Sequence, residues 1–137
     1  YDLYRSPDEQ LERRRKTVLS LKEKFADERE LEVHLRRSTA GIGGGHQSGG
    51  AVDLTLCDMN GSPVDMGSTY PAKCPEMATS YAVSMVARKH RKTLLKAMCS
   101  EGFVNYPAEW WHFSYGDQMW AAYRFKRYAI YGVKNSV

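Results

Sequence analysis

The chain has 137 residues, which is enough for one domain with one modest hydrophobic core. Hydrophobic residues make up 42% and charged residues 26%, an ordinary globular balance, and no apolar run approaches the roughly 20 residues that a membrane span needs. The net charge of +4 comes mainly from residues 13–16 and 88–92. Both clusters lie in helical patterns without a recognition motif, so we interpret them as solvated helix faces and expect no nucleic-acid partner.

The three cysteines, Cys57, Cys74 and Cys99, are an odd number and form no CxxC pair. This pattern argues against a disulfide framework, although one disulfide with one free thiol is compatible with it. It favours a reducing compartment. We therefore expect a cytoplasmic protein, with a periplasmic or exported location as the alternative.

The first part of the chain carries a strong helix start. Ser6 stands at the N-cap, Pro7 at the first helical position and Glu9 three residues after the cap. We expect this helix to reach about Ala26. The highly charged residues 27–38 then form a second short helix or a turn.

The remainder of the chain is predicted to supply most of the strands. Residues 39–50 contain six glycines and no hydrophobic period, which predicts a loop, while Asn60-Gly61 is the strongest hairpin signal. A helical stretch opens at Pro75 or Glu76, breaks in the middle and resumes at about residues 89–100. Strands are expected at 1–5, 51–57, 64–66, 103–106, 111–115 and within 118–132. The pattern predicts a single α+β domain, in which helices pack on one side of a small, mostly antiparallel sheet.

Two short motifs carry the chemistry. His46 and Asp53 lie seven residues apart, and Gly49 and Gly50 between them let the backbone turn so that the imidazole can fold back beside the carboxylate. Taken singly, a histidine is more often a satisfied polar residue than a ligand, and Asp53 could simply end a strand. The glycine run could also suggest a phosphate cradle, but the GxxxxGK[ST] pattern is absent and His46 sits within the run.

The second motif is Glu109-Trp110-Trp111-His112. A spacing of three places Glu109 and His112 on opposite faces of a regular strand, so we expect an irregular turn or bulge through Trp110 that brings both into one cleft. Two histidines and one acid form a three-ligand zinc site with a position left for water, the arrangement of catalytic zinc. The remaining acid, Glu109, is then free to move protons, and zinc lowers the pKa of water to roughly 7.

Together the two motifs resemble the signature of the zinc D-alanyl-D-alanine peptidases, His-x-x-Gly-x-Ala-x-Asp followed by Glu-x-Trp-His. The chain is most similar to the dipeptidases of the VanX type. The resemblance extends over nearly the whole chain, and further stretches carry it: Asp2-x-Tyr4-Arg5, Asp53-Leu-Thr-Leu56, Asp65-Met-Gly67, Tyr106-Pro107 and Tyr115-Gly116-Asp117 with Trp120.

The resemblance implies a role for each site residue. His46, Asp53 and His112 would bind one zinc ion, Glu109 would act as general base and then general acid, and Arg5 would stabilise the tetrahedral oxyanion. A permanently charged guanidinium suits that last task. Without the resemblance, Arg5 would be interpreted as part of a surface ion pair beside a helix start.

We also expect three aromatic residues to contribute to substrate binding. Tyr70 lies in a loop, residues 67–75, that passes over the site and can line the pocket. Trp110 and Trp111 divide the roles of core residue and cleft wall between them, and the sequence does not decide which takes which. The expected substrate is a small peptide, D-Ala-D-Ala or a peptidoglycan stem peptide.

Two departures from the family pattern leave alternatives open. Gly44 stands where members carry Ser or Thr, and Pro71 stands where the VanX type carries an acid that binds the ammonium group of the dipeptide. A D,D-carboxypeptidase that trims longer peptides is therefore the nearest alternative. A zinc-binding module without turnover is the second. Family members usually carry a segment before the first strand, so we expect residues 1–137 to be one peptidase domain that lacks an N-terminal segment.

Overall fold

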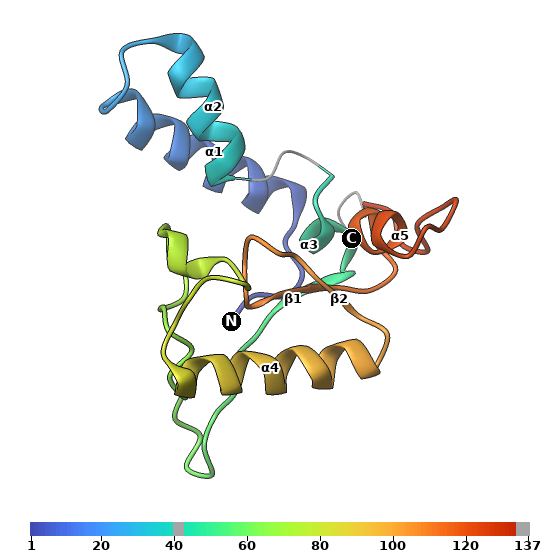
Figure 1. Ribbon diagram of the computed structural model, residues 1–137. Helices are drawn as coiled ribbons and strands as arrows, with labels where there is room; N and C mark the ends of the chain where they lie inside the picture. The colour runs from blue at the N-terminus through green and yellow to red at the C-terminus, as the bar shows by residue number, and fades with distance from the viewer. Residues whose placement is uncertain (40–42, 134–137) are drawn as a thin grey trace.

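The computed structural model describes residues 1–39 and 43–133 and confirms an α+β fold with a small antiparallel sheet (Figure 1). The short strand β3 (His112–Ser114) lies in the centre. Strands β1 (Ala51–Asp53) and β2 (Val104–Asn105) pair antiparallel with its two edges.

Alternation of side chains gives this sheet two different faces. The register places Val52 opposite Phe113 and Asp53 opposite His112. Val52 and Phe113 pack in the hydrophobic core. Because successive residues of a strand point to opposite faces, Asp53 and His112 point away from that core. The other buried members of the core cluster are Met66, Leu94, Trp110 and Trp111.

Helix α4 (Met85–Ser100) packs on the core side and lies in the lower part of the molecule in Figure 1, above a green loop. Ser84 caps it by accepting from the backbone N–H of Ala87. The short 3₁₀ helix η1 (Pro75–Met77) precedes it, so the helical stretch is broken as predicted. The buried Arg91 guanidinium donates to three backbone carbonyls, which satisfies its charge: those of Met66, Ala78 and Glu76.

Two helices form a hairpin that projects from the sheet (Figure 1). Helix α1 (Pro7–Lys22) starts at the predicted cap, where the Ser6 hydroxyl accepts from the backbone N–H of Glu9. It ends four residues before Ala26. The Asp27 carboxylate caps a new helix, α2 (Glu28–Ser38), so the predicted second helix is confirmed and the chain turns between the two.

Several expected strands are shorter than predicted or absent. Within 51–57 the strand ends at Asp53, and the stretch 1–5 contributes a single bridge between Asp2 and Asp53. Residues 64–66 form no strand, although the turn at Asn60-Gly61 is present beside a bridge from Cys57 to Pro63.

The end of the chain also differs from the prediction. It forms helix α5 (Gln118–Tyr123), and the described residues that follow it, up to 133, form no strand. The backbone N–H groups of Ile130 and Tyr131 both donate to the carbonyl of Gly116, so this segment folds back on the turn before α5 instead of pairing with the sheet.

The expected loop at 39–50 is only partly a loop. It contains the one-turn helix α3 (Gly45–Ser48), while residues 40–42 lie outside the described residues. No helix in the described parts of the chain combines the length and the apolar character that crossing a membrane requires. The three cysteines are free thiols in the structure.

Candidate metal centre and catalytic site

The sheet register places two of the expected ligands side by side. Asp53 ends β1, and His112, the first residue of β3, is its direct partner. Opposed residues of an antiparallel pair project from the same face with their Cβ atoms close together. His112 Nδ1 accordingly lies 2.9 Å from Asp53 Oδ1.

Helix α3 supplies the third ligand, and its glycines explain how. The Gln47 amide oxygen accepts from the backbone N–H groups of Gly43 and Gly44, which closes the turn into the helix. Gly49 ends the helix in the left-handed conformation at φ 72°. Gly45 packs so closely on Ala51 and Asp117 that a Cβ there would clash with both. Together these residues place His46 Nε2 3.3 Å from Asp53 Oδ1.

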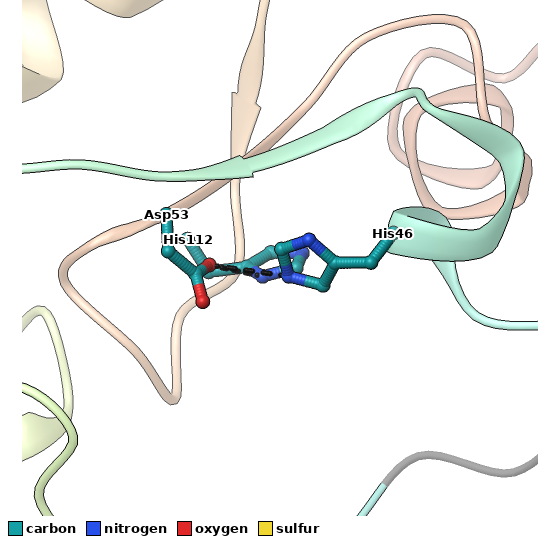
Figure 2. Close-up of side chains that lie close together, drawn as sticks. All are labelled: His46, Asp53 and His112. Carbon is teal, nitrogen blue, oxygen red and sulfur yellow. Dashed lines mark hydrogen bonds and ion pairs between the residues drawn. The ribbon is translucent and has the colours of Figure 1, made fainter. Parts of the chain in front are cut away.

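The three expected ligands therefore converge, as Figure 2 shows. One ligand atom from each of His46, Asp53 and His112 lies within 4.8 Å of the others. The two imidazole rings meet edge to face, with centroids 5.0 Å apart. His46 and Asp53 are buried and His112 is partly exposed, so the group has an open side.

Hydrogen bonds around this group orient its members in the way that metal sites require. His46 Nδ1 lies 2.7 Å from the carbonyl oxygen of Leu3, which can only accept, so Nδ1 keeps its proton and loss of the other ring proton leaves the Nε2 lone pair for a metal. The Tyr70 hydroxyl donates to Asp53 Oδ2 at 3.3 Å. Two neutral imidazole nitrogens and one carboxylate form a donor set that fits zinc.

Asp53 and His46 shift each other's pKa toward the charged forms. Burial would raise the pKa of Asp53, but hydrogen bonds from His112 and His46 outweigh it and hold the pKa well below its usual range. For His46, burial alone would lower the pKa, whereas the hydrogen bond and the charge of Asp53 raise it overall. Asp53 is therefore ionised near neutral pH and available as a ligand.

Glu109 stands beside the group without belonging to it. Its Oε2 lies 3.9 Å from His112 Nδ1, and its side chain is 29% exposed. Backbone bonds from Glu109 N–H to Tyr106 and from His112 N–H to Glu109 form the irregular turn that the sequence predicts. The Asn105 side chain donates to the carbonyls of Glu109 and His112 and holds this turn. Burial, opposed by the nearby histidines, raises the pKa of Glu109, which suits a group that must take and return a proton.

Arg5 lines the same cavity as these residues. Its guanidinium binds the Asp2 carboxylate and donates to Gln10 Oε1 at 2.6 Å. Its backbone N–H donates to the carbonyl of His46, which ties the segment before α1 to α3. The side chain is 13% exposed, so the ion pair with Asp2 lies largely inside the molecule.

The cavity over the site has a volume of about 720 Å³. Tyr70 and Trp111 line it and meet edge to face, with ring centroids 5.4 Å apart. Trp110 and Trp111 both belong to the core cluster, and the Trp110 indole N–H donates to the Ser68 hydroxyl. Of the two, Trp111 also lines the cavity.

Sequence reasoning missed several residues that line the cavity. Three buried atoms of cavity-lining residues have no hydrogen-bond partner in the described parts of the chain: Arg5 Nε, Gln47 Nε2 and Asp117 Oδ2. Gln47 is adjacent to a ligand, and Asp117 follows a turn glycine, but neither spacing indicates a site. Arg13, Lys16 and Lys73 also line the cavity. The two in the 13–16 cluster were interpreted from the sequence as part of a solvated helix face.

A family model described as D-ala-D-ala dipeptidase matches residues 6–130. The chain belongs to the D-ala-D-ala dipeptidase family of peptidases. The match contains His46, Asp53, Glu109 and His112, whereas Arg5 lies one residue before it. The family resemblance expected from the two motifs is therefore confirmed.

Named relatives agree with this family. The chain is 36% identical over 88 residues to a D-alanyl-D-alanine dipeptidase from Synechocystis. It is 38% identical over 74 residues to one from Escherichia coli and 33% identical over 75 residues to one from Enterococcus faecalis. These alignments cover 56, 53 and 53% of this chain and 36, 38 and 37% of the respective relatives, so the aligned part of the chain covers well under half of each relative.

Proposed function

We propose that this member of the D-ala-D-ala dipeptidase family is a zinc peptidase that hydrolyses D-alanyl-D-alanine-type bonds. The observation that carries the proposal is the convergence of His46, Asp53 and His112 within 4.8 Å, with Glu109 Oε2 3.9 Å from a ligand nitrogen. This geometry separates three metal ligands from one acid that stays free for proton transfer.

In this proposal His46 Nε2, one Asp53 oxygen and His112 Nδ1 hold one zinc ion per chain. When bound, zinc supplies a Lewis acid that makes water acidic and a carbonyl carbon electrophilic. Glu109, whose pKa burial raises, takes a proton from the attacking water and later gives it to the leaving amine. Arg5 lines the cavity with a permanent positive charge and stabilises the negative oxygen that develops as the peptide carbonyl is attacked.

Replacing Glu109 by Gln tests the assignment of the base. The amide preserves the size of the side chain but cannot accept the proton, so we expect hydrolysis to fall about a hundred- to ten-thousandfold while zinc content stays near one per chain. D-alanine release from D-Ala-D-Ala and metal analysis on the same sample provide the two readouts. Glu101→Gln, at the exposed end of α4, is the matched control and should keep full activity. Undiminished hydrolysis by Glu109→Gln would show that another group is the base.

A D,D-carboxypeptidase acting on longer peptides is a second candidate, and the cavity favours it. Its volume of about 720 Å³ is in the range that holds ligands much larger than a dipeptide. Its lining includes residues 70–73, where Pro71 and Lys73 offer no acid to an ammonium group. D-alanine release from an N-acetylated peptide, measured beside release from free D-Ala-D-Ala, separates the two activities. Zinc binding without either activity would favour the non-catalytic module.

A separate observation supports the cellular location that we propose. The three free thiols Cys57, Cys74 and Cys99 fit a reducing compartment, which supports a cytoplasmic protein. Fractionation of cells that produce the protein, with a periplasmic marker as reference, tests this assignment.

A further inference from the structure

Three basic side chains line the cavity from two separate segments. Arg13 and Lys16 come from α1, and Lys73 comes from the loop before η1. The two segments face one site, since Arg13 of α1 and Tyr70 of the loop both line this cavity. All three cations are exposed, as expected for groups at the mouth of a cavity. We call Arg13, Lys16 and Lys73 the basic rim.

The members of the basic rim differ in how far their charge is already neutralised. The Arg13 guanidinium binds Asp2 at 3.1 Å and Glu9 at 2.9 Å. Lys16 pairs with Glu12 at 3.6 Å through side chains that are 74 and 51% exposed, an interaction that solvent largely screens. Lys73 has no hydrogen bond or ion pair within the described residues. The charge of Lys73, and in large part that of Lys16, therefore remains available.

The three acids that line the cavity each have another role than neutralising the basic rim. Asp53 is a candidate metal ligand, and Glu109 is the candidate base. Asp117 is buried and caps α5 by accepting from the backbone N–H of Trp120. Zinc would add further positive charge at the base of the cavity. Lys73 and Lys16 thus present positive charge toward a substrate that approaches from the rim.

The basic groove on the outer face of α4 shows what an ordinary solvated cluster looks like in the same molecule. Its cavity of about 480 Å³ is lined by Arg88, Lys89, Lys92 and Lys96 together with Met85 and Thr93. None of the described residues that line it is a His, Cys, Asp or Glu, so it offers neither a candidate metal ligand nor a candidate catalytic base. The basic rim differs because it shares one cavity with the metal centre.

We propose that the basic rim, with Lys73 as its principal member, is a carboxylate-binding subsite that selects peptides with a carboxylate outside the bond to be cleaved. The inference deepens the proposed peptidase function and rests on it. The carboxylate can be the C-terminus of the peptide or an acidic side chain before the D-alanines. Both present the same anion to an ammonium group, and the test must distinguish them.

Three peptides separate these sources: N-acetyl-L-Glu-D-Ala-D-Ala, its Gln counterpart, and the Gln peptide with a C-terminal amide. Glu and Gln have the same shape, so the first pair differs only in side-chain charge. The protein is tested as the unaltered chain, as Lys73→Glu and Lys73→Gln, and as the control Lys92→Glu. The control makes the same charge change on α4, outside this cavity.

At low salt we expect Lys73→Glu to lower kcat/KM about tenfold for peptides that carry the recognised carboxylate, with Lys73→Gln intermediate. The peptide lacking that carboxylate should change less than about twofold, and 0.5 M salt should reduce the difference because a Debye length there is only a few ångströms. If kcat/KM falls only for the Glu peptide, the recognised carboxylate is the acidic side chain. If it falls for both peptides with a free C-terminus and not for the amide, the recognised carboxylate is the C-terminus. Equal effects on all three peptides, no effect, or the same effect from Lys92→Glu would overturn the subsite.

Failure of the peptidase function gives a different result. If no peptide is cleaved between its two D-alanine residues in any variant, the proposed activity is wrong, and calorimetric binding of the same peptides then decides the subsite alone. Weaker binding of carboxylate-bearing peptides to Lys73→Glu, but not to Lys92→Glu, supports the basic rim. Binding that does not depend on Lys73 overturns it.

Discussion

At the scale of single residues, Asp53 is the centre of the site. Its Oδ1 lies 3.3 Å from His46 Nε2 and 2.9 Å from His112 Nδ1, and its Oδ2 accepts from the Tyr70 hydroxyl. A carboxylate offers several acceptor positions, so it can bind a metal through one oxygen while a hydrogen bond fixes the other. This gives Tyr70 a positioning role in addition to any contact with substrate.

Removal of the Tyr70 hydroxyl tests that role. In Tyr70→Phe the ring can keep its stacking on Tyr1 and its contact with Trp111, because both use the aromatic face and edge. Only the hydrogen bond to Asp53 Oδ2 is lost, and we expect zinc affinity to fall roughly tenfold, as for other ligand-supporting residues. Competition with a chromophoric chelator measures it. The exposed Tyr128 provides the control Tyr128→Phe, and equal affinities in all three proteins would restrict Tyr70 to lining the cavity.

At the scale of elements, the parts of the site that local chemistry dictates were predictable. The Ser6 cap and the irregular turn after Tyr106 follow from residue types and spacing, whereas the direct pairing of Asp53 with His112 is a long-range contact that the sequence did not predict. Helix α3 was not predictable, since the glycine run reads as a loop. Its position depends on the local hydrogen bonds of Gln47 and on contacts distant in sequence, such as the packing of Gly45 on Asp117. The same reason explains the absence of a strand after α5, where the chain folds back on Gly116.

The close packing of α3 makes Gly45 sensitive to the smallest substitution. A Cβ at this position would meet the Asp117 carboxylate and, at 2.8 Å, the Cβ of Ala51 in β1. The strand cannot move without disturbing its pairing, so we expect Gly45→Ala to destabilise the fold by about 1–3 kcal/mol and to weaken zinc binding through His46. Gly132→Ala is the control, since its added methyl meets nothing within 4 Å. Urea unfolding of both variants gives the comparison, and an unchanged midpoint for Gly45→Ala would show that α3 can shift freely.

At the scale of the whole molecule, α3 and two of the three short strands, β1 and β3, meet at the candidate metal centre. The strands have three, two and three residues, which is little pairing for an independent sheet. The proposed metal would join the segment around α3 to β1 and β3 on the face opposite the core. Metal binding at this site is therefore expected to contribute to the free energy of unfolding as well as to catalysis.

Metal removal should consequently destabilise the protein strongly. Zinc that binds only the folded chain adds about 4 kcal/mol when its concentration is a thousandfold above Kd, which corresponds to a Tm increase of roughly 10 °C or more for a domain of this size. Thermal unfolding with zinc and with chelator measures the difference. His46→Ala, which lacks one ligand, should lose most of it, whereas alkylation of the three free thiols should leave it unchanged. A zinc effect that persists in His46→Ala but disappears on alkylation would place the stabilising metal at cysteines and contradict the assigned centre.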